Sequence, residues 1–126
     1  MKDLRLQFQI QATCEEVYLA LTNPFTIELW TGYPAIMSEV TGSEFFLWEG
    51  DISGMNLEFE KNHKIVQEWY FEDPENKSIV TILLNKSKTG THINLEHTNI
   101  PDQEFEFIKT GWKENYFGGL KEFFEE

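Results

Sequence analysis

The first residues of the chain alternate between apolar and polar side chains. Leu4, Leu6, Phe8 and Ile10 occupy every second position, and the residues between them are polar or charged. A period of two places alternate side chains on opposite faces of an extended chain. The pattern therefore predicts a half-buried strand over Asp3–Gln11.

Two short helices are predicted to follow this strand. Thr13 and Glu16 have the spacing of a capping box, which begins a helix, and Asn23 with the proline after it ends that helix. A second helical stretch covers Phe25–Trp30 and stops before Gly32.

Apolar and polar residues then alternate in short segments separated by turn residues, which predicts strands from Ala35 to Thr98. Gly54 is expected to mark a bulge, and Asp73–Asn76 is expected to form a turn. The predicted strands are Ile36–Val40, Glu44–Trp48, Ile52–Glu60, His63–Glu72, Ser78–Asn85 and Thr91–Thr98.

The end of the chain has a helical period. Apolar residues recur at steps of three and four, and Asp102 is expected to cap the helix. Gly119 lies seven residues after Trp112 and is expected to face the sheet, whereas Gly118 is expected to lie laterally. Gly119→Leu should therefore overpack, while Gly118→Ala should be neutral or mildly stabilising. The apolar stripe consists of Phe105, Ile108, Trp112, Tyr116, Leu120 and Phe123.

This order of elements predicts an α+β protein, an antiparallel sheet with helices on one face. The 126 residues suit a single domain over 1–126, with 40% hydrophobic and 15% aromatic residues and no linker or repeat. The net charge of −12 argues against nucleic-acid partners and anionic membranes, and leaves a neutral ligand, a basic partner or simple solubility. A lone cysteine, Cys14, and the absence of an apolar signal or spanning run indicate a cytoplasmic protein.

Several segments resemble a known family. The segments are TNPFTIELWTG, FFLWEGDISG, HKIVQEWYF, VTILLNKSKTGTHINLEH and NIPDQEFEFIKTGWKENYFGGLKEFF, and together they resemble the C-terminal domain of activators of the heat-shock protein 90 ATPase. That family belongs to the START-like, or SRPBCC, helix-grip superfamily. The resemblance implies six or seven antiparallel strands curved around a long C-terminal helix, often with a hydrophobic cavity between them, and it extends to stand-alone bacterial members.

The sequence departs from the family pattern in two respects. It contains no counterpart of the additional N-terminal domain of the eukaryotic co-chaperones, which makes much of their contact with the chaperone. The segment Lys61–His63 also lacks the proline common before the IVQEW strand.

Aromatic and aliphatic side chains on the inward faces of these elements are candidates for lining such a cavity. The functional interpretation is a pocket for a small hydrophobic or amphipathic ligand, and the alternative is an ordinary aromatic core. The candidate ligand-binding residues are Trp30, Trp48, Leu57, Trp69, Phe71, Ile93, Leu95, His97, Trp112 and Tyr116.

Motifs of catalytic, metal or cofactor sites are absent from the sequence. His92 and His97 are five positions apart on one strand and so face opposite ways, which disfavours a shared metal ion. His97 is expected to face inward as a hydrogen-bonded core residue rather than as a general base. His97 with Tyr116 is the one pair that we nominate for an enzyme, and we otherwise assign no catalytic residue, metal or cofactor.

Three functions follow in order of preference. The first is non-catalytic binding of a small hydrophobic or amphipathic molecule. The second is a co-chaperone-like interaction with a heat-shock ATPase, and the third is a cyclase or hydrolase that uses the same cavity. Exposed aromatic residues such as Phe107 or Phe124 leave both a monomer and a homodimer open.

Overall fold

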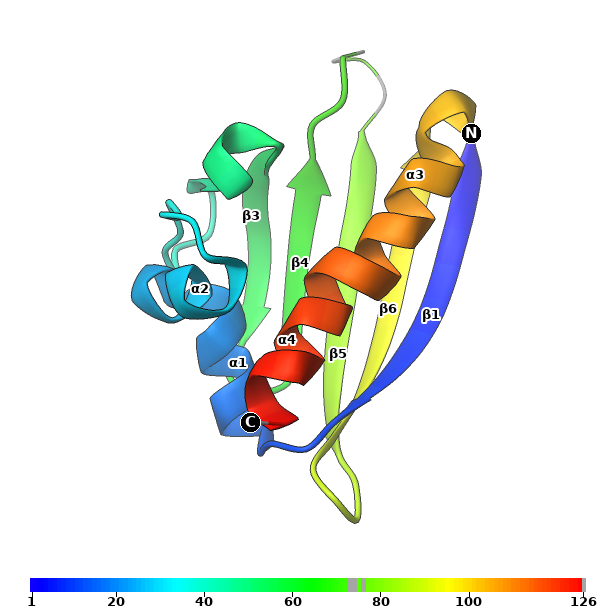
Figure 1. Ribbon diagram of the computed structural model, residues 1–126. Helices are drawn as coiled ribbons and strands as arrows, with labels where there is room; N and C mark the ends of the chain where they lie inside the picture. Colours follow the sequence, from blue (N-terminus) through cyan, green and yellow to red (C-terminus); the bar gives the residue numbers. More distant parts are fainter. Residues whose placement is uncertain (73–74, 76, 126) are drawn as a thin grey trace.

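The computed structural model describes residues 1–72, 75 and 77–125, and consists of one curved sheet with helices on one face (Figure 1). The six strands are antiparallel and lie in the order β1-β6-β5-β4-β3-β2. The strands are β1 (Lys2–Ile10), β2 (Glu44–Leu47), β3 (Ile52–Glu60), β4 (Lys64–Trp69), β5 (Ser78–Lys86) and β6 (Thr91–Ile100). The helices are α1 (Cys14–Thr22), α2 (Pro24–Thr31), η1 (Trp48–Gly50), η2 (Asp102–Glu104), α3 (Phe105–Thr110), η3 (Gly111–Tyr116) and α4 (Phe117–Glu125).

The α+β architecture and most predicted strands are confirmed. β1 buries Leu4 and Ile10 and pairs with β6, which lies about ninety residues later in the chain. β3 has the predicted bounds, Ile52–Glu60. The bulge, however, lies at Leu57, where the register shifts between Asn56 and Glu58. A side chain at Gly54 would instead collide with the main chain of β4, so this glycine permits a close approach of two strands.

The predicted strand Ile36–Val40 is wrong. Only Ile36 pairs, through an isolated bridge to Phe46, and the chain then turns away with Val40 59% exposed. Pro34 lies just before this segment and Gly42, with φ 90°, just after it. The short apolar run between them therefore reaches the edge strand at one residue instead of forming a continuous ladder.

The two N-terminal helices are confirmed, and α2 is one residue longer at each end than the predicted Phe25–Trp30. Thr13 and Glu16 form the capping box, with the Glu16 amide 3.1 Å from Thr13 Oγ1 and the Thr13 amide 3.0 Å from Glu16 Oε1. The hydrogen bonds that the Thr13 amide and hydroxyl donate to the Glu16 carboxyl lower its pKa. Asn23 Oδ1 then caps α2, and Gly32 ends it in the left-handed conformation.

The C-terminal helix crosses the sheet diagonally (Figure 1) but is not a uniform α-helix. Its first turn is a 3₁₀ turn, and Asp102 does not cap it, because that carboxylate pairs with the Met1 ammonium at 2.8 Å. η3, in the middle of the helix, is a π-helix, which widens the turn by one residue.

The π-helix accounts for the first of the paired glycines, Gly118, and reverses one expectation. A Cβ at Gly118 would lie 2.5 Å from the Lys113 carbonyl oxygen, so Gly118 is the position where a side chain cannot be placed without a shift. A Cβ at Gly119 would lie 3.7 Å from the Trp30 ring, which is an ordinary contact. The sequence-based assignment of Gly119 to the inner face is therefore supported, but the expectation that Gly118→Ala is tolerated is not.

The core lies between the sheet and the helices. It joins buried residues of β1, β2, β4, β5 and β6 to Trp112, Tyr116, Phe117 and Leu120 of the C-terminal helix, and Ile52 and Phe59 of β3 pack against it partly buried. Within the described residues, no helix is both long and apolar enough to cross a membrane. The predicted turn Asp73–Asn76 falls largely outside the described residues.

Candidate functional site

An aromatic cluster occupies the centre of the space between the sheet and the C-terminal helix. It consists of Trp30, Trp48, Trp69, Trp112, Tyr116 and Phe117. The Trp112 ring stacks on Trp69 with centroids 4.6 Å apart and lies 4.6 Å from Tyr116. The rings therefore pack directly against one another, with offset and edge-on contacts that aromatic pairs favour.

Trp48 closes one side of this cluster at a strained turn. Trp48 and Glu49 have φ values of 49° and 57°, in the left-handed region of backbone conformation that residues other than glycine rarely adopt. In this turn the centroid of the Trp48 ring lies 5.7 Å from that of Trp30 and 6.0 Å from that of Tyr116. A left-handed residue costs roughly 1–2 kcal/mol, which these ring contacts help to offset.

A chain of hydrogen bonds passes through His97 beside the cluster. Trp112 Nε1 donates to His97 Nδ1 at 3.1 Å, which places the imidazole proton on Nε2. His97 Nε2 lies 3.1 Å from Ser78 Oγ, and that hydroxyl donates to the Trp69 carbonyl oxygen at 2.9 Å. Burial lowers the pKa of His97 to about 3, so the ring is neutral near pH 7 and both of its nitrogens are engaged.

Tyr116 shares this buried environment. Its side chain is 3% exposed, and burial raises the pKa of its hydroxyl. Among the described residues, Tyr116 makes no hydrogen bond to His97. The structure thus brings the two nominated residues into one region without joining them as a proton-transfer pair.

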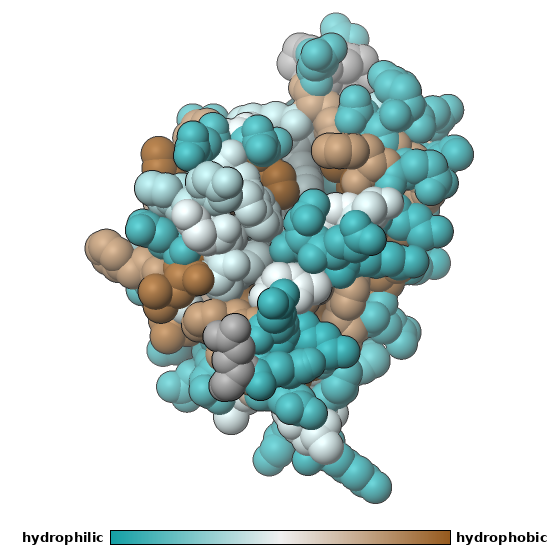
Figure 2. Space-filling view, viewed as in Figure 1, coloured by the Kyte–Doolittle hydropathy of each residue, from teal (hydrophilic) through white to brown (hydrophobic). Residues whose placement is uncertain are grey.

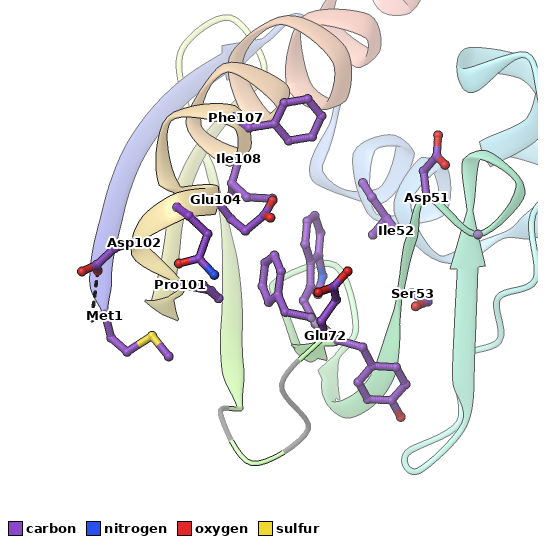
Figure 3. Close-up of a pocket in the computed structure, with 15 residues that line it drawn as sticks. Met1, Asp51, Ile52, Ser53, Glu72, Pro101, Asp102, Glu104, Phe107 and Ile108 are labelled. Atoms are coloured by element: carbon purple, nitrogen blue, oxygen red, sulfur yellow. Dashed lines mark ion pairs between the residues drawn. The ribbon is translucent and has the colours of Figure 1, made fainter.

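A groove of about 890 Å³ opens next to the cluster, between α3 on one side and the ends of β3 and β4 on the other (Figure 3). Its walls include Ile52, Trp69, Phe71, Phe107 and Ile108, and four carboxylates lie around them. The full lining is Met1, Gly50, Asp51, Ile52, Ser53, Trp69, Tyr70, Phe71, Glu72, Pro101, Asp102, Gln103, Glu104, Phe107 and Ile108.

The charged side chains that line the groove are all acidic. Figure 3 shows Glu72 and Glu104 directed toward the space between α3 and the strand ends. Asp102 pairs with the Met1 ammonium, and hydrogen bonding to that ammonium lowers its pKa. No Lys or Arg among the described residues lines the groove, and the Met1 ammonium is paired with Asp102, so the groove combines apolar walls with a negative rim.

The predicted site residues separate into three groups. Trp69 and Phe71 line the groove. Leu57 lies half-buried at the β3 bulge, outside the core cluster. The remaining predicted residues are buried in the packed interior or, in the case of Trp48, pack partly buried against it, and their binding of a ligand stays a prediction. These are Trp30, Trp48, Ile93, Leu95, His97, Trp112 and Tyr116.

Sequence reasoning did not assign Ile52, Phe107 or Ile108 to a site. These residues meet only when α3 crosses the end of the sheet, so no local spacing connects them. The sequence did contain one signal for this site. In the predicted meander, the start of β3, the end of β4 and the start of α3 all fall at the same end of the sheet. No group of three His, Cys, Asp or Glu side chains among the described residues is arranged to hold a metal ion.

The curved antiparallel sheet, the two short helices after β1 and the diagonal C-terminal helix define a helix-grip protein of the START-like class. The family model described as "Activator of Hsp90 ATPase homolog 1-like protein" matches residues 11–125, and the chain belongs to this family.

Individual relatives agree with that assignment. The chain is 30% identical over 112 residues to human activator of 90 kDa heat shock protein ATPase homolog 1, a match that covers 87% of this chain and 33% of the human protein. The chain thus spans about a third of the length of the curated relatives it matches.

Two solved structures are similar over nearly their full lengths. An HSP90 activator from Plasmodium falciparum superposes with a TM-score of 0.85 at 28% identity, over 94% of this chain and 92% of that one. An Aha1 dimer from Colwellia psychrerythraea gives 0.87 at 20% identity, over 99% and 97%, and at that identity it supports the fold alone.

Proposed function

We propose that the chain is a non-catalytic protein-interaction domain that regulates an Hsp90-type ATPase. The observation that carries this proposal is the family match over residues 11–125, together with the structural match to an Hsp90 activator. The packed aromatic cluster supports it, because rings in mutual contact leave binding to the outer surface. The cytoplasm is the proposed location, in keeping with a single, half-buried cysteine.

The test is ATP turnover by the purified Hsp90-type ATPase of the same cell, titrated with the chain. We expect turnover to rise and saturate as the complex forms. An Hsp90 inhibitor added at the end of each titration measures contaminating ATPase activity, and the chain alone serves as the second control. Unchanged turnover at concentrations that saturate a directly measured complex would reject regulation, and the lack of any complex would reject the interaction.

A second candidate function is binding of a small amphipathic molecule in the groove. Its volume of about 890 Å³ is that of a typical small-molecule site, which spans roughly 300–1,000 Å³. Apolar walls next to Asp51, Glu72 and Glu104 favour a ligand with a hydrocarbon or aromatic body and a positive end. This proposal moves the ligand from the predicted interior to the groove beside it.

A pair of probes of equal chain length tests the groove. We expect dodecylammonium to bind more tightly than dodecanoate, as measured by calorimetry below the micellar concentration of each. Phe107→Ser should weaken binding, whereas Val40→Ser, at an exposed position that does not line the groove, should not. Equal affinity for both probes, or equal binding by both variants, would contradict a specific site.

An enzymatic function has less support. Trp112 and Ser78 engage both nitrogens of His97, so neither nitrogen is free to take a proton from a substrate. Whether the chain acts as a monomer or a homodimer is decided by sedimentation equilibrium across a concentration series.

A further inference from the structure

Charge is distributed unevenly along the sequence. Residues 6–60 contain nine carboxylates and neither Lys nor Arg, whereas the other residues carry thirteen carboxylates and all ten Lys and Arg. All nine of these carboxylates come after β1, in the part of the chain that forms α1, α2, β2 and β3, and these elements lie together on one side of the molecule (Figure 1). This side of the surface therefore carries most of the net negative charge.

The outer face of α2 on this side is apolar. Phe25 and Leu29 are 78% and 71% exposed, and the exposed Glu28 lies beside them. Residues at i, i+3 and i+4 share one face of a helix, so the three form a single surface, which we call the α2 face. Figure 2 shows hydrophobic residues gathered over this part of the molecule, at the left of the view.

Packing within the chain does not account for the apolar side chains of the α2 face. Ile27 and Trp30 hold the opposite side of the helix in the core, while Phe25 and Leu29 lie outside the core cluster. Trp30 Nε1 also donates to the Ala20 carbonyl oxygen at 2.7 Å, which ties α2 to α1. The α2 face is thus held in place before any partner binds, which lowers the entropy cost of association.

We propose that the α2 face binds an amphipathic segment of a partner protein whose apolar side chains are flanked by Lys or Arg. Phe25 and Leu29 would bury the apolar side chains, and Glu28 with the surrounding negative field would attract the cations. A second copy of the chain is disfavoured, because it would bring two copies of Glu28 and of the surrounding acidic surface together. The inference deepens the proposed function, on which it rests, by naming the face that meets the ATPase.

The probe is a synthetic amphipathic helical peptide with a leucine stripe flanked by lysines. Two matched peptides carry Gln or Glu in place of Lys, and affinities are measured by fluorescence anisotropy at low and high salt. We expect binding in the order Lys, Gln, Glu, with the difference between Lys and Gln shrinking as salt rises. Backbone amide shifts should concentrate in α2.

Substitutions at the α2 face should affect binding of the lysine peptide selectively. The double variant Phe25→Ser/Leu29→Ser should weaken it about tenfold or more, as expected when central apolar contacts are truncated. Glu28→Gln should weaken it less, and only at low salt. Val40→Ser is the control, because Val40 is 59% exposed and belongs neither to the α2 face nor to the lining of the groove, and it should leave the affinity unchanged.

Several results would overturn the inference. These are unchanged affinity in the double variant, equal binding of the Lys and Gln peptides at low salt, or amide shifts that concentrate in the groove. Self-association that disappears in the double variant, as seen by sedimentation, would assign the α2 face to a homodimer instead.

The ATPase assay separates this inference from the proposed function. If the chain stimulates the ATPase and the double variant stimulates it equally, the proposed function stands and the α2 face is rejected as its docking site. If the chain does not stimulate the ATPase but binds the lysine peptide through α2, the regulatory function is rejected. The preference of the α2 face for a cationic amphipathic segment is then retained.

Discussion

Trp112 and Phe25 are both aromatic residues on helices that cover the sheet, yet their surroundings are opposite. Trp112 is 2% exposed, stacks on Trp69 and donates a hydrogen bond to His97. Phe25 is 78% exposed and lies outside the core cluster. The contrast separates two roles: the aromatic cluster stabilises the fold, and the α2 face is available for binding.

Their polar neighbours differ in the same way. His97 is enclosed and both of its nitrogens have partners, whereas Glu28 is exposed. Substitutions in the aromatic cluster should therefore change the free energy of unfolding, and substitutions on the α2 face should change association. Four predictions test this separation, beginning with the largest expected effect on stability.

Trp112→Ala should lower the free energy of unfolding by about 3–5 kcal/mol, as expected for removing a large buried aromatic side chain. The variant leaves a cavity beside Trp69 and removes the donor to His97 Nδ1. Urea unfolding followed by circular dichroism measures the change. Trp112→Phe, which keeps an aromatic ring, is the control and should cost less. A loss below about 1 kcal/mol in Trp112→Ala would show that the cluster contributes little.

Acid should destabilise the protein through His97. Burial lowers its pKa to about 3, while the unfolded ring titrates near 6.5. Between these values the unfolded state binds a proton that the folded state does not, so the free energy of unfolding falls as pH decreases. From pH 7 to pH 5 the loss from this group should be roughly 2 kcal/mol.

The variant His97→Gln isolates this contribution, because it lacks the titrating ring. Its unfolding free energy should depend less on pH between 7 and 5 than that of the parent protein. The carboxyls of Glu16 and Asp102 have lowered pKa values, so they titrate at more acidic pH. Both proteins contain them, and they do not contribute to the difference. Parallel pH profiles for the two proteins would contradict a neutral, buried His97.

Gly118→Ala should lower the free energy of unfolding by about 1 kcal/mol or more, whereas Gly119→Ala should be neutral or slightly stabilising. A Cβ at Gly118 meets the Lys113 carbonyl oxygen, and this overpacking outweighs the helix propensity that alanine gains. At Gly119 the Cβ makes an ordinary contact with Trp30. Thermal melts of the two variants provide the comparison, and the reverse order would contradict the π-helix as the reason for Gly118.

Phe25→Ser should change the free energy of unfolding by less than about 0.5 kcal/mol, the usual range for exposed positions. Urea unfolding measures this value alongside the affinity for the lysine peptide. A loss of stability comparable to that of a core substitution would indicate that Phe25 packs in the folded chain, and would remove the distinction between the two regions.

Local patterns were sufficient for most of the fold. The alternation in β1, the Thr13–Glu16 capping box and the Asn23 boundary each involve neighbours within a few residues, and the structure confirms all three. The prediction of a strand over Ile36–Val40 was wrong because a strand forms only where it pairs with a neighbouring strand. In this segment only Ile36 pairs with the edge strand β2.

The candidate site was less accessible to sequence reasoning. Apolar identity and strand parity correctly indicated that Trp112 and His97 face inward. They did not indicate that the ring centroids of Trp69 and Trp112 would lie 4.6 Å apart, nor that Phe71 and Phe107 would line the same groove. Those outcomes depend on how the C-terminal helix crosses the sheet.

The sequence by itself determined the order of the elements apart from the segment Ile36–Val40, the α+β class, the family and the acidic character of the first half. These follow from periodicity, motifs and charge, which are properties of the chain and not of its packing. Only the tertiary structure decided that the aromatic cluster is packed, that the groove lies beside it and that Phe25 and Leu29 stay exposed. Each of those outcomes is set by contacts between residues far apart in the chain, because volume is filled or left open only when such elements meet.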